Sequence, residues 1–98
     1  MAGVRLAESA QQDLLDAWLH IARDSPTAAD RVLDAIEREA DALAGQPLMG
    51  RARPELGKGV RSWPTATPYL LFYLAEKAGG ITILRILHHA RDIQRIEF

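Results

Sequence analysis

Hydrophobic residues in the first half of the chain recur at helical spacing in two stretches. The first follows Ser9, which with Gln12 three residues later forms a predicted capping box. The second follows Ser25, a typical N-cap residue with proline at the next position, and Gly45 is a predicted left-handed helix end. The short connection predicts an antiparallel helical hairpin. The apolar positions are Leu14, Leu15, Trp18, Leu19 and Ala22, then Ala29, Val32, Leu33, Ile36, Ala40 and Leu43.

Shorter apolar runs elsewhere in the chain predict strands. Val4 and Leu6 alternate with polar or small residues near the N-terminus. Residues 69–75 and 81–87 are rich in aromatic and β-branched residues, and a Lys-Ala-Gly-Gly turn joins them. With a short strand at residues 60–63, these runs predict a three-stranded meander.

The expected fold class is α+β with the order β-α-α-β-β-β, an N-terminal strand and a helical hairpin packed on a small antiparallel sheet. Residues 45–59 contain four glycines and two prolines, so we expect one long loop without an element of its own. Loops of that length in compact domains are often functional. The length of 98 residues predicts a single domain over residues 1–98.

Composition narrows the class of protein. Apolar residues make up 48% and charged residues 26%, as in globular proteins. The chain has no cysteine, which excludes disulfides, iron–sulfur clusters and thiolate zinc sites. It has neither an apolar run of about 18 residues nor a basic stretch followed by a short apolar segment at its start. We therefore expect a cytoplasmic protein.

Charge is unevenly distributed although the net charge is only −1. Residues 8–41 contain nine acids and three bases, whereas residues 45–98 contain eight bases and four acids. The acids are explained if the helices simply expose a solvated face. Alternatively, the second half presents a cationic surface to an anionic partner.

Three segments carry a family resemblance in a fixed order and spacing. Residues 4–32 include Ser-Ala-Gln-Gln-Asp-Leu, and residues 47–64 begin Pro-Leu-Met-Gly-Arg and end Val-Arg-Ser-Trp-Pro. Residues 69–92, the most specific segment, include Tyr-Leu-Leu-Phe-Tyr and Ile-Leu-Arg-Ile-Leu-His-His-Ala-Arg-Asp. Together they cover nearly the whole chain and resemble the ParE-type toxins of the ParE/RelE superfamily.

The resemblance implies a toxin of a type II toxin–antitoxin module. Its partner would be a ParD-like ribbon-helix-helix antitoxin whose C-terminal segment wraps the toxin in a hetero-oligomer, with operator DNA contacted only through the antitoxin. The implied target is DNA gyrase, inhibited by binding rather than by catalysis, and no cofactor or metal is expected. One alternative is a ribosome-dependent mRNA endoribonuclease of RelE type. Another is a decayed toxin that serves mainly as a corepressor with its antitoxin.

The ribonuclease alternative needs a general base, a general acid and cations for the phosphorane charge. The candidates are Arg61, Arg85, His88 and Arg91. Strand alternation places Arg85 and His88 on opposite faces unless the strand ends near residue 87. These residues are fewer than a dedicated nuclease is expected to have. For a gyrase inhibitor, which acts by binding, no catalytic residues are predicted.

For antitoxin or target binding, we expect a set of basic and aromatic side chains from the second half of the chain. Several have a structural alternative. Arg85 either pairs with a carboxylate such as Asp92 or lies on an open face, and His88 is a possible hydrogen-bonded strand end. Trp63 either closes the core or anchors a partner. The binding set is Arg51, Arg53, Arg61, Trp63, Arg85, His88, His89 and Arg91.

Overall fold

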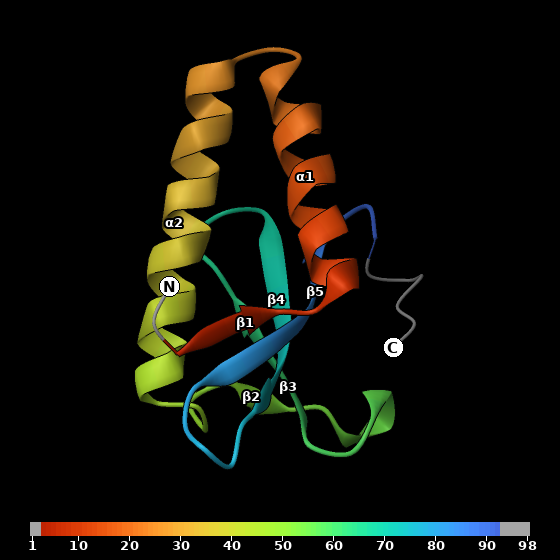
Figure 1. Cartoon of the computed structure of the whole chain (residues 1–98). Coiled ribbons are helices and arrows are strands. Elements are labelled where there is room, and N and C mark those ends of the chain that lie inside the picture. Colours follow the sequence, from red (N-terminus) through yellow and green to blue (C-terminus); the bar gives the residue numbers. More distant parts are fainter. Residues whose placement is uncertain (1–2, 93–98) are drawn as a thin grey trace.

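The structure, a computed structural model, describes residues 3–92, in which two helices cover one face of a five-stranded sheet (Figure 1). Within this range no helix combines the length and the apolar character needed to cross a bilayer. The elements are β1 (Val4–Leu6), α1 (Glu8–Ala22), α2 (Pro26–Gly45), β2 (Arg51–Ala52), the 3-10 helix η1 (Pro54–Leu56), β3 (Val60–Pro64), β4 (Tyr69–Ala75) and β5 (Ile81–His88).

The strands lie in the order β1-β5-β4-β3-β2. β3, β4 and β5 form the predicted antiparallel meander, and β2 adds a short antiparallel edge. β1 pairs with β5 in parallel, with Val4 opposite Ile81. The predicted fold class is confirmed, although the sheet is mixed rather than wholly antiparallel.

One extra residue interrupts the pairing of β5 with β4. Ile83 lies opposite Tyr73 and Arg85 lies opposite Phe72, so Leu84 has no partner of its own. Such a bulge shifts the alternation of side chains along the strand. As a result, isoleucines on both sides of the bulge face the helices.

The core lies between the helical hairpin and the sheet. The helices contribute three alanines, which let them lie close to the strands, together with Ile36 and Leu43, and the strands contribute large apolar residues. The hairpin itself is antiparallel, as predicted (Figure 1). The buried core cluster is Ala10, Ala17, Ile36, Ala40, Leu43, Tyr69, Leu71, Tyr73, Ile81, Ile83 and Ile86.

The start of α1 differs from the prediction. The helix begins at Glu8 with Ala7 as its N-cap, and no side chain caps it, so the capping box at Ser9 is wrong. The Ala7 amide instead donates to the Ile83 carbonyl at 2.9 Å. Pairing of β1 with β5 therefore fixes where the helix starts.

The start of α2 follows the prediction and its end does not. The Ser25 hydroxyl accepts a hydrogen bond from the Ala28 amide at 3.1 Å, which confirms the N-cap. Gly45 is still helical, and Gln46 is the C-cap with a φ of −139°. The left-handed cap is therefore wrong, because the helix ends one residue later, directly before a proline that cannot continue it.

The segment after α2 is more ordered than the predicted loop. It contains β2 and η1, so the expectation of no element over residues 45–59 is wrong. Arg51 pairs with Ser62 and Ala52 with Arg61 along β3. Two residues are too few for a strand signal in the sequence, because period-two alternation needs about four residues.

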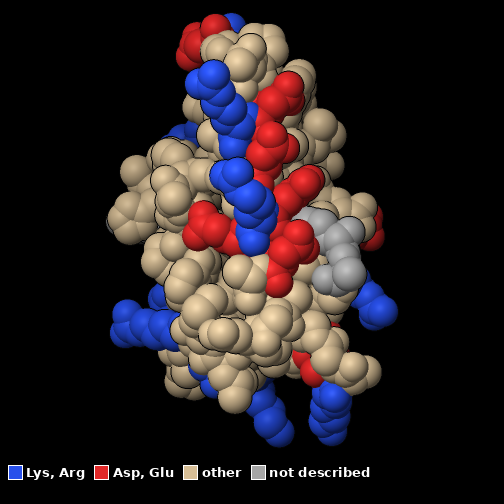
Figure 2. All heavy atoms as spheres, turned by 90° about the vertical axis from the view of Figure 1, so that its left-hand side faces the viewer, with Lys and Arg blue, Asp and Glu red and all other residues tan. Residues whose placement is uncertain are grey.

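The two ends of the molecule differ in the charge of their exposed side chains. Along α2, acids and bases form neighbouring exposed rows, whereas basic side chains predominate around the lower end of the view (Figure 2). Acids spaced by three or four residues share one helix face. The exposed acids of α2 are Asp30, Asp34, Glu37 and Asp41, and the exposed bases are Arg31 and Arg38.

Candidate partner-binding surfaces

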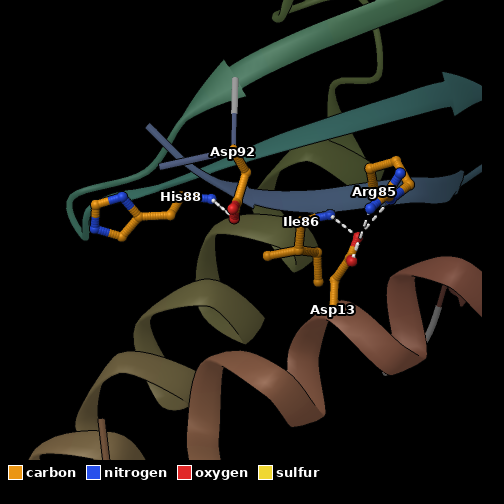
Figure 3. A network of polar contacts seen from close by, with 5 residues as sticks. All are labelled: Asp13, Arg85, Ile86, His88 and Asp92. Atoms are coloured by element: carbon orange, nitrogen blue, oxygen red, sulfur yellow. Dashed lines mark hydrogen bonds and ion pairs between the residues drawn. The ribbon is translucent and has the colours of Figure 1, made fainter. Parts of the chain in front are cut away.

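Arg85 forms a bidentate ion pair with Asp13 of α1 (Figure 3). Its Nε and Nη2 atoms donate to the two carboxylate oxygens at 2.7 and 3.0 Å. The side chains of Arg85 and Asp13 are 24% and 11% exposed, so the pair is largely shielded from water. Such fork-shaped pairs are among the stronger hydrogen-bonded contacts in proteins.

The same carboxylate completes the edge of β5. β1 ends at Leu6, and beyond that point no strand among residues 3–92 pairs with β5 on this side. The Ile86 amide donates to Asp13 Oδ2 at 3.0 Å, so a side chain replaces the missing strand. The alternative that Arg85 pairs with a carboxylate is therefore confirmed, but the carboxylate is Asp13 of α1 and not the suggested Asp92.

His88 and Asp92 form a compact turn at the end of β5 (Figure 3). Asp92 Oδ2 accepts from the His88 amide at 2.9 Å, and His88 Nδ1 accepts from the amides of Ala90 and Arg91 at 3.1 and 3.2 Å. The imidazole and the Tyr69 ring form a T-shaped contact, with centroids 5.3 Å apart. Desolvation, together with the nearby Arg91 charge, lowers the pKa of His88. These contacts give His88 a structural role.

A polar hollow of about 510 Å³ lies between α1 and the end of β5. It brings Arg85 and Arg91 together, and the Arg91 guanidinium donates to the Tyr69 hydroxyl at 3.3 Å. It also contains groups absent from the predicted set. These are Asp13, Asp16 and His20 of α1, Tyr69 of β4, and Asp92.

Arg61 lies in a different part of the sheet. It pairs with Tyr73 in β4, and Arg85 pairs with Phe72. Tyr73 and Phe72 are consecutive, so their cross-strand partners leave opposite faces of the sheet. Arg61 Nη1 donates to the Gly50 carbonyl at 2.8 Å. The structure therefore does not bring the four ribonuclease candidates into one site.

The other binding candidates are spread over the molecule. Arg51 and His89 are exposed. Arg53 binds Glu55 at 2.8 Å, and its guanidinium lies 5.9 Å from the centre of the Phe72 ring. Trp63 is half-buried against the core, and its indole nitrogen donates to Glu39 at 3.0 Å. Among residues 3–92 no group of three or more His, Asp or Glu side chains is arranged to hold a metal ion.

An apolar groove runs along the outside of the helical hairpin. The groove, called the hairpin groove below, has a volume of about 310 Å³. Leu15 lines the groove and is 51% exposed, and Leu19, one turn further along α1, is 52% exposed. The Trp18 indole donates to Asp30 at 2.9 Å and so fixes part of its wall. The groove is lined by Leu6, Gln11, Leu14, Leu15, Trp18 and Leu33.

Comparison with known proteins identifies the family. Residues 4–93 match the family described as the ParE toxin of the type II toxin–antitoxin system parDE. The chain is 31% identical over 91 residues to Toxin ParE1 of two Mycobacterium tuberculosis strains, covering 92% of each protein. The fold is similar to a solved chain titled "Chromosomal ParDE TA system from P. aeruginosa", with a TM-score of 0.72 and 23% identity over 90% of this chain and 96% of that one. The chain therefore belongs to the ParE family of toxins of type II toxin–antitoxin systems.

Proposed function

We propose that this toxin is held inactive by a ParD-like ribbon-helix-helix antitoxin and, when free, inhibits DNA gyrase by binding to it. Membership of the ParE family supports the antitoxin partner, and the resemblance to ParE-type toxins supports the target. The main structural support is that large apolar side chains are exposed in pairs on a small protein, while the candidate catalytic groups are dispersed. Paired apolar side chains favour protein partners over chemistry on a small substrate.

The hairpin groove is the surface that best fits the antitoxin. Its lining is almost entirely apolar, and its walls come from two packed helices and the strand before them. An amphipathic segment can place its apolar side in such a groove, at the cost of ordering on binding. Arg91, an exposed cation of the predicted set, is available for an acidic antitoxin side chain.

Gyrase inhibition is favoured over RNA cleavage because of the contacts of the basic residues. Asp13 already neutralises Arg85, and His88 Nδ1 is occupied by two backbone amides. A general base needs a free lone pair within reach of the substrate proton. The ribonuclease remains the second candidate because four side chains of suitable type line the polar hollow. They are Arg85, Arg91, Tyr69 and His20.

The test adds purified toxin to gyrase supercoiling and DNA-cleavage assays. We expect inhibition that grows with the ratio of toxin to gyrase and is relieved by the antitoxin encoded beside it. Messages cut on translating ribosomes, with gyrase unaffected, would instead support the RelE-type candidate. A toxin that does neither, yet strengthens antitoxin binding to its operator, would support the corepressor role.

A further inference from the structure

The large apolar side chains exposed among residues 3–92 fall into two pairs. The first pair is Leu15, which lines the hairpin groove, and Leu19, one turn further along α1. Leu48 and Met49, at 70% and 42% exposure, lie in the turn directly after α2, and we call them the Leu48–Met49 tip. Single exposed apolar residues are common on protein surfaces, but an adjacent pair at the end of a turn is a candidate contact.

The turn that carries the tip is held in one conformation. The Met49 amide donates to the Gln46 carbonyl at 3.0 Å, and Pro47 occupies the second position of the turn. Proline there fixes φ close to the value that the turn requires. The backbone of the tip is therefore ordered before any partner arrives.

Two side chains of the sheet, Tyr73 and Arg61, form hydrogen bonds to the backbone of the turn. The Tyr73 hydroxyl donates to the Pro47 carbonyl at 2.8 Å and accepts from the Gly50 amide at 2.9 Å. Arg61 Nη1 donates to the carbonyls of Gly50 and Leu48, at 2.8 and 3.3 Å. Burial raises the pKa of Tyr73, so its hydroxyl keeps the proton that it donates.

These contacts order a segment whose two largest side chains remain in water. Folding alone does not need apolar residues there, because polar side chains would leave the same backbone bonds intact. A rigid apolar pair loses little conformational entropy on binding, which is what a preorganised contact provides. Exposed Leu48 and Met49 on this turn therefore suit insertion into an apolar pocket of a partner.

The charge around the tip differs from that around the hairpin groove. Residues 46–54 contain two arginines and no acid, and the Arg61 guanidinium lies directly against the turn. Basic side chains also predominate at this lower end of the molecule (Figure 2). The hairpin, in contrast, carries most of the acids, including Asp30 beside the groove. Surfaces of opposite charge favour different partners.

We infer that the Leu48–Met49 tip is the contact by which the free toxin engages the protein that it poisons. The matching site on that protein is an apolar pocket edged by carboxylates, which would pair with Arg51 at the side of the tip. This inference rests on the proposed function, under which the poisoned protein is DNA gyrase. The antitoxin, in this arrangement, occupies the hairpin groove instead.

Two matched double substitutions test this division. Leu48→Ser with Met49→Ser removes the tip, and Leu15→Ser with Leu19→Ser removes the apolar pair at the groove. We expect the tip variant to inhibit gyrase supercoiling about tenfold or more weakly, with its Kd for the antitoxin unchanged. We expect the groove variant to inhibit gyrase as the wild type does and to bind the antitoxin about tenfold or more weakly. Both variants should fold, because all four substituted residues are exposed. Circular dichroism and thermal melting check this.

A third variant probes the role of the turn itself. Tyr73→Phe keeps the ring but removes the hydroxyl that contacts Pro47 and Gly50. It should weaken inhibition of gyrase while leaving both apolar side chains in place. The inference fails if the folded tip variant inhibits gyrase as the wild type does, or if it loses the antitoxin to the same degree. If the wild type itself does not inhibit gyrase, the proposed function fails and this inference falls with it.

Discussion

Gly50 is a position where one neighbouring side chain decides which residue is tolerated. A Cβ atom there would collide with the Tyr73 hydroxyl and lie 2.8 Å from Tyr73 Cε1 and 2.9 Å from the Ser62 carbonyl oxygen. Real Cβ atoms do not approach other atoms this closely. The requirement comes from close packing, because Gly50 is not among the glycines with positive φ.

Gly50→Ala should therefore destabilise the protein, whereas Gly45→Ala should not. We expect the free energy of unfolding to fall by about 1–3 kcal/mol for Gly50→Ala, because the turn must move off the sheet. Gly45 is helical with no atom within 4 Å of an added Cβ, so alanine there should add up to about 1 kcal/mol. Urea unfolding measures both changes, and equal stabilities would contradict the packing described for Gly50.

The α1 and α2 helices begin in different ways, although each has a serine near its start. Ser25 accepts the Ala28 amide and caps α2, whereas Ser9 lies inside α1 and caps nothing. α1 starts where β1 ends, since Ala7 is bonded to β5. Tertiary pairing outweighs a local capping signal at this helix.

Replacing each serine by alanine separates the two cases. Ser25→Ala should lower the free energy of unfolding by about 1 kcal/mol, the usual value of an N-cap. Ser9→Ala should change it by less than about 0.5 kcal/mol, as expected for an exposed helix position. Thermal or urea unfolding provides the comparison. A larger loss at Ser9 would mean that the capping box forms after all.

At this scale the sequence predicts the type and order of most elements but not the contacts that end them. Periodicity finds both helices and the strands of the meander, because each buries one regular apolar face. It misses β2, which is only two residues long, and the bulge at Leu84. It places Leu15 and Leu19 on the apolar face of the first helix but does not reveal that the sheet leaves both of them exposed.

Across the whole molecule, Asp13 and Arg85 connect the hairpin to the sheet over 72 residues of sequence. Nothing in either local sequence identifies the other residue, so the pair could not be predicted. The carboxylate serves both Arg85 and the free edge of β5. Its loss therefore removes two charge-assisted hydrogen bonds of a partly buried cation and the side-chain acceptor of the Ile86 amide.

Asp13→Ala should lower the free energy of unfolding by about 2–3 kcal/mol, because hydrogen bonds to charged groups are lost at a shielded site. Asp16→Ala, one turn away and exposed, is the matched control and should change it by less than about 0.5 kcal/mol. Chemical denaturation followed by Trp fluorescence would measure both. Equal stability of the two variants would show that the ion pair contributes nothing.

The parallel pairing of β1 with β5 joins the first and the last strand of residues 3–92, with Val4 opposite Ile81. During synthesis β1 emerges before the two helices, whereas β5, its hydrogen-bonding neighbour, is translated after both helices and after the other strands. Until β5 has been made, the helical hairpin therefore lacks part of the sheet that buries its inner face. The apolar faces that the two helices turn toward the sheet are therefore fully covered only after β5 has emerged, so this fold is completed late relative to its helices.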